Sequence, residues 1–220
     1  MTSSPSAARP VVAAFDVDGT LTVRDCVRPF LERVGGRRGL LVAVGRRPVA
    51  TVMAAAQRDR DALKDVVVGG VFRGRRVVDV EAEGRSFASY VQTRFLRPDM
   101  MGRLRWHQKM GHRTVLVSAS LRPYLEPLAS ALGIERVLCT DVERDEFDAD
   151  RYGRHLAGGN CRAEEKATRL RAWLDEQGIA DAELWAYGDS RGDREMLEMA
   201  HHPVWVQGTT VQAVPAEMTR

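Results

Sequence analysis

Short apolar runs alternate with helical patterns along most of this chain. Runs typical of buried parallel strands cover residues 11–15, 114–117, 136–139, 183–187 and 203–206. Apolar residues recur at helical spacing over 100–110, 122–132, 163–177 and 196–199. Because strands and helices alternate at this spacing, the sequence predicts an α/β fold with a doubly wound parallel sheet. The stretch 147–156 has the pattern of a hairpin.

Residues 24–96 show a different, mainly helical pattern. Helices are predicted near 27–34, 40–56, 62–67 and 87–95, with interruptions at Gly35-Gly36 and at Pro48. The β-branched run Val66-Val67-Val68 leaves a strand as an alternative at that point. We therefore expect a discontinuous core, 11–23 and 97–220, with the helical segment 24–96 inserted after its first strand.

Composition and cysteine usage narrow the class of protein. Of the 220 residues, 44% are hydrophobic and 29% are charged, as in soluble globular proteins, and no apolar run is long enough to cross a bilayer. Residues 1–10 lack the pattern of a signal peptide and are expected to be a disordered tail. The three cysteines have no C-x-x-C spacing, which argues against disulfides and structural zinc and favours the cytoplasm.

The net charge of +3 hides two opposed parts. Residues 24–96 carry a net charge of +7, and the rest of the chain carries −4. No basic, aromatic-rich ladder or helix-turn-helix pattern accompanies this charge, so a nucleic-acid partner is not expected. The apolar segment 40–56 has arginines beside it, but packing within the insertion is favoured over contact with a membrane.

Polar, site-like residues follow three of the predicted strands. Asp16 and Asp18 follow the first strand, Ser118 the second, and Asp189 and Asp193 the fourth. The carboxyl ends of parallel strands share one edge of the sheet, so we expect these side chains to lie together. Four carboxylates at one edge need a cation, and Mg²⁺ is the hard ion that takes such oxygens while leaving positions open for phosphate.

This set of residues is suited to phosphoryl transfer. One aspartate can attack phosphorus, and a second acid two residues away can act as general acid and base on the same centre. Gly19 permits a sharp exit from the strand. Lys166 lies beside the start of a predicted helix. Its ammonium, together with a hydroxyl group, can hold the phosphoryl oxygens.

The motifs resemble those of the haloacid-dehalogenase superfamily of phosphatases. The first motif of that superfamily is similar to Phe15-Asp16-Val17-Asp18-Gly19-Thr20-Leu21-Thr22. The second, third and fourth motifs are similar, in this order, to Ser118, Lys166 and Gly188-Asp189-Ser190-x-x-Asp193, and the resemblance covers residues 11–207. The resemblance implies a Rossmann-like core, and the insertion resembles the helical cap of the phosphoserine-phosphatase-like branch.

The resemblance also implies a role for each motif residue. It makes Asp16 the nucleophile and Asp18 the general acid and base. It implies that Mg²⁺ is held by Asp16, the Asp18 carbonyl and Asp189, with Asp193 supporting the metal shell. It assigns phosphate binding to Ser118 and Lys166. The expected activity is hydrolysis of a small phosphorylated metabolite through an aspartyl-phosphate.

The substrate is less defined than the reaction. Asp25 and Arg28 of the insertion are candidate substrate contacts, with ordinary surface charges as the alternative. Gly192 stands where relatives that act on phosphoserine have Asn, which does not favour phosphoserine itself. Asn160 is either a contact of the active-site loop or a capping residue. The alternative functions are a phosphatase for a lipid head group such as phosphatidylglycerophosphate, and a non-hydrolytic phospho-acceptor signalling domain.

Overall fold

A six-stranded sheet forms the centre of the molecule. The computed structural model describes residues 9–45, 48–57, 59–206 and 208. The strands are β1 (Val11–Phe15), β2 (Arg113–Leu121), β3 (Arg136–Arg144), β4 (Tyr152–Ala157), β5 (Glu183–Gly188) and β6 (His202–Trp205). Their order is β4-β3-β2-β1-β5-β6, and β4 alone of these six pairs antiparallel with its neighbour. The predicted α/β fold with a mostly parallel sheet is confirmed.

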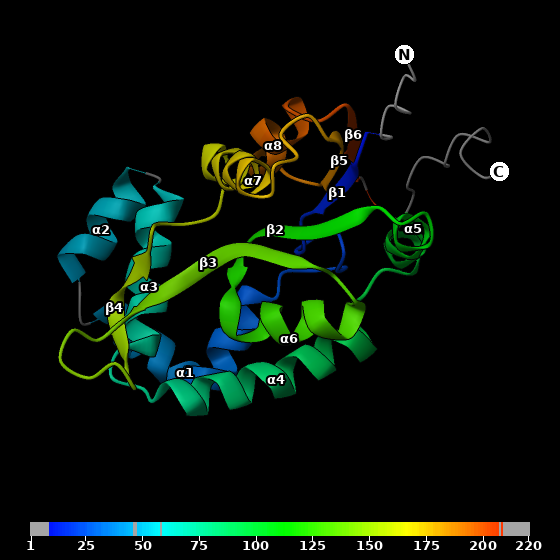
Figure 1. Ribbon diagram of the computed structural model, residues 1–220. Helices are drawn as coiled ribbons and strands as arrows, with labels where there is room; N and C mark the ends of the chain where they lie inside the picture. The colour runs from blue at the N-terminus through cyan, green and yellow to red at the C-terminus, as the bar shows by residue number, and fades with distance from the viewer. Residues whose placement is uncertain (1–8, 46–47, 58, 207, 209–220) are drawn as a thin grey trace, which may run out of the picture.

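Helices cover both faces of this sheet. The core helices are α5 (Pro98–Lys109), α6 (Arg122–Leu132), α7 (Glu164–Glu176) and α8 (Arg194–Glu198). Figure 1 shows α7 and α8 on one face and α5 and α6 on the other. The alternation of side chains along β1 matches this, because Val12 and Ala14 pack in the cluster with α7, whereas Ala13 and Phe15 pack in the cluster with α6.

The segment 24–96, hereafter the helical insertion, lies between β1 and α5. It consists of α1 (Val27–Gly45), α2 (Pro48–Ala56), α3 (Arg60–Phe72) and α4 (Val77–Arg94). As the glycine pair predicted, α1 is interrupted, at Gly36, which has a φ of 66°. In Figure 1, α4 runs beneath α6, on the far side of that helix from the sheet.

The sequence predicted a helix near 62–67 and left a strand at Val66-Val67-Val68 as the alternative, and the structure has the helix. These residues lie inside α3, which the Asp59 carboxylate begins by accepting hydrogen bonds from the backbone N–H groups of Asp61 (3.0 Å) and Ala62 (2.9 Å). Val68 and Phe72, one helical turn apart, are fully buried. Capping and the buried helix face therefore outweigh the β-branched preference for strands.

The hairpin begins earlier in the chain than predicted. Its first strand is β3, residues 145–151 form the connection, and β4 is the second strand. Polar side chains hold the connection: the Asp145 carboxylate accepts from the Phe147 N–H (3.1 Å), and the Asp148 carboxylate from the Asp150 N–H (3.1 Å). Phe147, which the prediction placed at the start of the hairpin, is 89% exposed.

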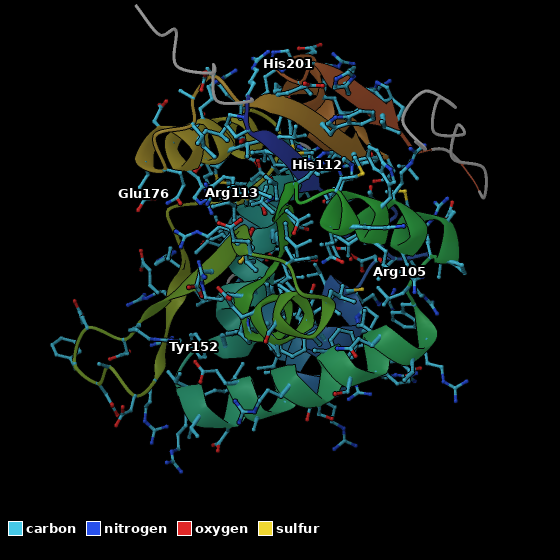
Figure 2. The ribbon with its side chains drawn as sticks, turned by 45° about the vertical axis from the view of Figure 1, so that its right-hand side comes forward. Arg105, His112, Arg113, Tyr152, Glu176 and His201 are labelled. Carbon is cyan, nitrogen blue, oxygen red and sulfur yellow. The ribbon has the colours of Figure 1, made fainter. Side chains whose placement is uncertain are left out.

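The helical insertion covers the outer edge of β4. The Tyr152 carbonyl accepts from the Gly74 N–H (2.8 Å), and its N–H donates to the Arg75 carbonyl (3.0 Å). Further along, the Leu156 N–H donates to the Asp65 carboxylate of α3 (2.8 Å). Figure 2 shows Tyr152 far from His201, which precedes β6 at the opposite edge of the sheet.

The ends of the described chain bear on two further predictions. Residues 1–8 of the predicted tail lie outside the described residues, whereas the Pro10 carbonyl accepts from the Glu183 N–H (2.8 Å) beside β1. Among the described residues, no helix combines the length and apolar character needed to cross a membrane. The three cysteines are buried free thiols.

Close packing of the insertion on the core predicts opposite effects for two glycine substitutions. In Gly69→Ala, the new Cβ of α3 would lie 1.9 Å from the Arg154 carbonyl oxygen of β4, so we expect the free energy of unfolding to fall by about 1–3 kcal/mol. Gly102→Ala in α5 is the matched control, because its Cβ meets no atom within 4 Å and alanine favours a helix. Urea denaturation measures both, and equal effects would contradict the predicted difference in packing.

Candidate functional site

Three neighbouring strands bring the predicted site residues to one edge of the sheet. β1 lies between β2 and β5, Asp16 directly follows β1, and Asp189 directly follows β5. Ser118 lies in the carboxyl-terminal half of β2, and its Oγ accepts from the Ser120 N–H (3.1 Å). The topology therefore gathers residues that are more than 170 positions apart in the chain.

Lys166 lies between two buried carboxylates. It belongs to the first turn of α7, and its Nζ donates to Asp16 Oδ1 and to Asp193 Oδ1, both at 2.5 Å. The Lys166 side chain is 3% exposed. Burial alone would lower the pKa of Lys166, but the two carboxylates raise it above its ordinary value. The ammonium is therefore a fixed positive charge beside Asp16.

The environment of Asp16 favours a proton or a cation. Burial raises the pKa of Asp16 to about 7, and the charges of Asp193 and Asp18 add to this, whereas Lys166 opposes it. Burial and the Asp193 charge also raise the pKa of Asp189. A further cation, in addition to the Lys166 ammonium, would stabilise these carboxylates in their ionised form.

Asp16, Asp189 and Asp193 form an acidic cluster. One carboxylate oxygen from each lies within 4.8 Å of the other two. The orientation of Asp193 is fixed by Ser190, whose N–H and hydroxyl donate to Oδ2 at 2.9 and 2.8 Å. Carboxylate oxygens in a partly buried cluster are the donors that Mg²⁺ prefers, so these residues fit that ion.

Gly19 leaves the room that this cluster needs. Its φ is +86°, a left-handed conformation that glycine adopts without strain. A Cβ at this position would lie 2.2 Å from Asp189 Oδ2. The glycine therefore allows the loop after β1 to turn directly beneath the Asp189 carboxylate.

Asp18 is held by a separate set of hydrogen bonds. Its carboxylate accepts from the Cys26 N–H (2.9 Å) and from the Ser120 hydroxyl (2.5 Å), and Tyr124 OH donates to Ser120 Oγ (2.6 Å). Burial raises the pKa of Asp18 to about 6, and the Asp25 charge contributes to this rise. A carboxyl group with a pKa near neutrality is suited to both give and take a proton.

Lys64 lies beside the predicted site residues, although the sequence did not single it out. From α3 its Nζ donates to the Ala119 carbonyl, next to Ser118, and to Asn160 Oδ1 (2.8 Å). Burial lowers the pKa of Lys64 to about 8, although Asp18 and Asp25 act in the opposite direction. The chain has only three lysines, and this scarcity was the one signal that could have drawn attention to it.

Asn160 joins the insertion to the core. Its Oδ1 accepts from Thr140 Oγ1 (2.9 Å) as well as from Lys64, and its Nδ2 donates to Asp61 of α3 (2.6 Å). The alternatives for Asn160 were a contact with the active-site loop and a capping role. Through Lys64, Asn160 is connected to the Ala119 carbonyl in the carboxyl-terminal part of β2, and its direct contacts are with Thr140, Lys64 and Asp61.

Asp25 and Arg28 have visible structural roles. Asp25 accepts from the backbone N–H groups of Val27 (3.3 Å) and Arg28 (3.1 Å), and so caps the start of α1. The Arg28 side chain is 81% exposed and pairs with Glu32 one turn later. Both residues also border a cavity of about 840 Å³ between α1 and α3.

Comparison with known proteins agrees with this geometry. The model of the haloacid dehalogenase-like hydrolase family matches residues 13–198, a range that includes every predicted site residue. The chain belongs to the haloacid dehalogenase-like hydrolase family. The resemblance inferred from the four motifs is thereby confirmed, and the protein is a hydrolase.

Relatives of this hydrolase match along most of their length. Protein CicA of Caulobacter vibrioides is 36% identical over 191 residues, which cover 87% of this chain and 83% of CicA. A solved structure of a protein of unknown function from Bordetella pertussis superposes with a TM-score of 0.69 at 25% identity, covering 87% of each chain.

A phosphoserine phosphatase solved with bound substrate has the same fold. It superposes on this hydrolase with a TM-score of 0.57 at 14% identity, covering 88% of this chain and 84% of that one. The two proteins therefore share a fold over most of both chains.

Proposed function

We propose that this protein hydrolyses a small phosphomonoester in a Mg²⁺-dependent reaction through an aspartyl-phosphate on Asp16. The observation that carries the proposal is the placement of Lys166, whose Nζ lies 2.5 Å from both Asp16 and Asp193. A buried carboxylate nucleophile beside a fixed ammonium and an acidic cluster is suited to receiving a phosphoryl group.

Asp16, Asp189 and the backbone carbonyl of Asp18 would hold Mg²⁺, and Asp193 would support the shell around it. The proximity of the Asp16, Asp189 and Asp193 carboxylates is consistent with this assignment. When bound, the ion would neutralise charge on the carboxylates and on the phosphoryl oxygens. Hydrogen bonds from Ser190 to Asp193 keep that carboxylate oriented toward Lys166.

The two carboxyl groups after β1 divide the chemistry. In the first half-reaction an Asp16 oxygen forms a bond to phosphorus, the bond from phosphorus to the ester oxygen breaks, and Asp18 gives its proton to the leaving alcohol. In the second, Asp18 takes a proton from water, whose oxygen attacks phosphorus, and inorganic phosphate leaves with the Asp16 carboxylate restored. The pKa of Asp18, raised by burial to about 6, supports both roles.

Other residues would position the phosphoryl group and exclude water. Ser118, fully buried beside the Ala119 carbonyl, and Lys166 would donate to the phosphoryl oxygens. The helical insertion 24–96 would act as a cap domain over the core formed by 11–23 and 97–220. Three buried free thiols support a reducing compartment, the cytoplasm.

Turnover of a generic phosphomonoester tests the proposal. With Mg²⁺ present, p-nitrophenyl phosphate is expected to release nitrophenol in multiple turnovers, and excess chelator is expected to abolish that release because the acidic cluster loses its cation. Adding Mg²⁺ back in excess of chelator should restore the rate. Turnover that continues unchanged in chelator would reject the metal-dependent mechanism, and a single phosphorylation without turnover would indicate a phospho-acceptor domain.

A further inference from the structure

The cavity between α1 and α3 has mainly aliphatic walls. Its volume is about 840 Å³, within the range of sites that enclose a drug-sized ligand. The apolar lining comes from both helices, as Val27, Leu31, Leu40, Leu41, Leu63 and Val67. Uncharged polar side chains are absent from this lining in the described part of the chain. The cavity can therefore take up hydrocarbon along its aliphatic walls, while the charged side chains that border it are the partners open to a polar group.

Two parts of the lining connect the cavity to the catalytic residues. Asp25 and Lys64 both belong to the lining. The residue after Asp25, Cys26, donates its N–H to Asp18, and Lys64 donates to the Ala119 carbonyl beside Ser118. The lining thus adjoins residues that contact Asp18 and the backbone beside Ser118, so the leaving group of an ester bound at Asp16 could extend toward the cavity.

The charges around the cavity suit an anionic amphiphile. Arg28, Arg37, Arg60 and Lys64 border it, against the two carboxylates of Asp25 and Glu32. Leu41, at the border, is 75% exposed, so an apolar side chain stands where the cavity meets solvent. An amino-acid leaving group could pair with these charged side chains, but it would leave the aliphatic walls without an apolar partner.

We propose that the cavity holds the hydrocarbon chain of the leaving alcohol, so that the substrate is an amphipathic phosphomonoester. This proposal rests on the phosphatase function proposed above and specifies its substrate class. Hydrolysis breaks the bond from phosphorus to the ester oxygen, transfers the phosphoryl group to Asp16 and then to water, and leaves a long-chain alcohol that carries the proton from Asp18. Burial of the chain adds binding energy without any new polar contact.

A chain-length series of alkyl monophosphates tests the proposal. From ethyl to dodecyl phosphate, at concentrations where the esters are monomeric, kcat/KM is expected to rise by up to about fourfold per methylene that enters the cavity, as the ~0.8 kcal/mol of a buried CH₂ gives. Calorimetric binding to the Asp16→Asn variant provides a readout that does not need turnover. There, dodecyl phosphate is expected to bind at least about 100-fold more tightly than ethyl phosphate.

Variants of the lining connect the effect to this cavity. Leu63→Gln places an amide on the α3 wall, and Leu41→Asn does so at the exposed border, where the fold tolerates the change. Each is expected to lower the ratio of dodecyl to ethyl kcat/KM by about fivefold or more. Val78→Gln on α4 is the matched control, since Val78 is 50% exposed and outside the cavity lining, and it should leave both rates unchanged. Thermal melts verify that each variant folds.

The outcomes separate this proposal from the phosphatase function itself. Equal kcat/KM along the series, with equal binding of dodecyl and ethyl phosphate, would overturn the hydrocarbon site while the phosphatase function stands. If no ester is hydrolysed but dodecyl phosphate binds more tightly, the phosphatase function fails and the cavity assignment stands. Phosphatidate in phosphatidylcholine vesicles identifies the source of the amphiphile: turnover there supports a membrane lipid, and turnover of monomers alone supports a soluble one.

Discussion

Replacing Asp16 by Asn is expected to lower kcat/KM for p-nitrophenyl phosphate by about 10⁴-fold or more, because the amide cannot form the phosphoryl ester bond. The side chain would keep its shape and its place beside Lys166 Nζ, 2.5 Å from the present carboxylate oxygen. The measurement is steady-state turnover at saturating Mg²⁺, together with acid-quenched labelling by a radioactive phosphoester. Both turnover and labelling should be lost.

Asp18→Asn gives the contrasting result that identifies the nucleophile. With labelled p-nitrophenyl phosphate, whose nitrophenolate leaves without needing a proton from residue 18, that variant should retain label but lose turnover, because the amide cannot activate water for the second half-reaction. Asp175→Asn, on the exposed side of α7, is the matched control and should have the activity of the unmodified protein. A labelled Asp16→Asn variant, or one with more than a few per cent of the original rate, would show that another group attacks phosphorus.

Replacing Lys166 by Met is expected to destabilise the protein as well as inactivate it. The substitution leaves the buried carboxylates of Asp16 and Asp193 without their cation, and breaking a buried ion pair in this way costs about 3–5 kcal/mol. Loss of a fixed charge at the phosphoryl group should also lower kcat by about 10²–10³-fold. Urea denaturation in chelator measures the free energy of unfolding, and turnover with Mg²⁺ measures the rate.

A second substitution distinguishes the two effects of Lys166. In the double variant Lys166→Met/Asp193→Asn one unpaired charge is removed, so part of the lost stability should return while turnover stays lost. Lys109→Met, at the exposed end of α5, should change stability by less than about 0.5 kcal/mol. A Lys166→Met protein as stable as the original would show that the three buried charges do not stabilise one another.

The order of strands and helices in the core was predictable because each apolar run is short and ends abruptly. Within the insertion the pattern was less informative. The helix predicted at 87–95 is only the second half of α4, which begins at Val77. The first half was missed because the mostly polar stretch 81–86 interrupts the apolar periodicity. At Val66–Val68 the β-branched side chains left a strand open as an alternative to the predicted helix, and the Asp59 cap together with packing of Val68 and Phe72 decides for the helix.

The site residues were predictable where they follow strands, since topology alone brings such positions together. Lys64 was not, because it reaches the Ala119 carbonyl across 55 positions from a helix whose placement against β4 no local pattern encodes. Ser120 and Tyr124 were not assigned roles for the same reason: their chain of hydrogen bonds to Asp18 exists only after β2 and the loop after β1 meet.

The hydrogen bonds that the insertion makes to β4 also have a consequence for solubility. An unpaired edge strand offers a row of N–H and C=O groups on which a second chain can add, the first step of amyloid-like association. On that edge of β4 the backbone groups of Tyr152 and the N–H of Leu156 are already hydrogen-bonded, to Gly74, Arg75 and the Asp65 carboxylate. At the opposite edge β6 has only four residues and includes Pro203, which has no N–H to donate. The helical insertion thus also protects the β4 edge of the sheet against edge-to-edge aggregation.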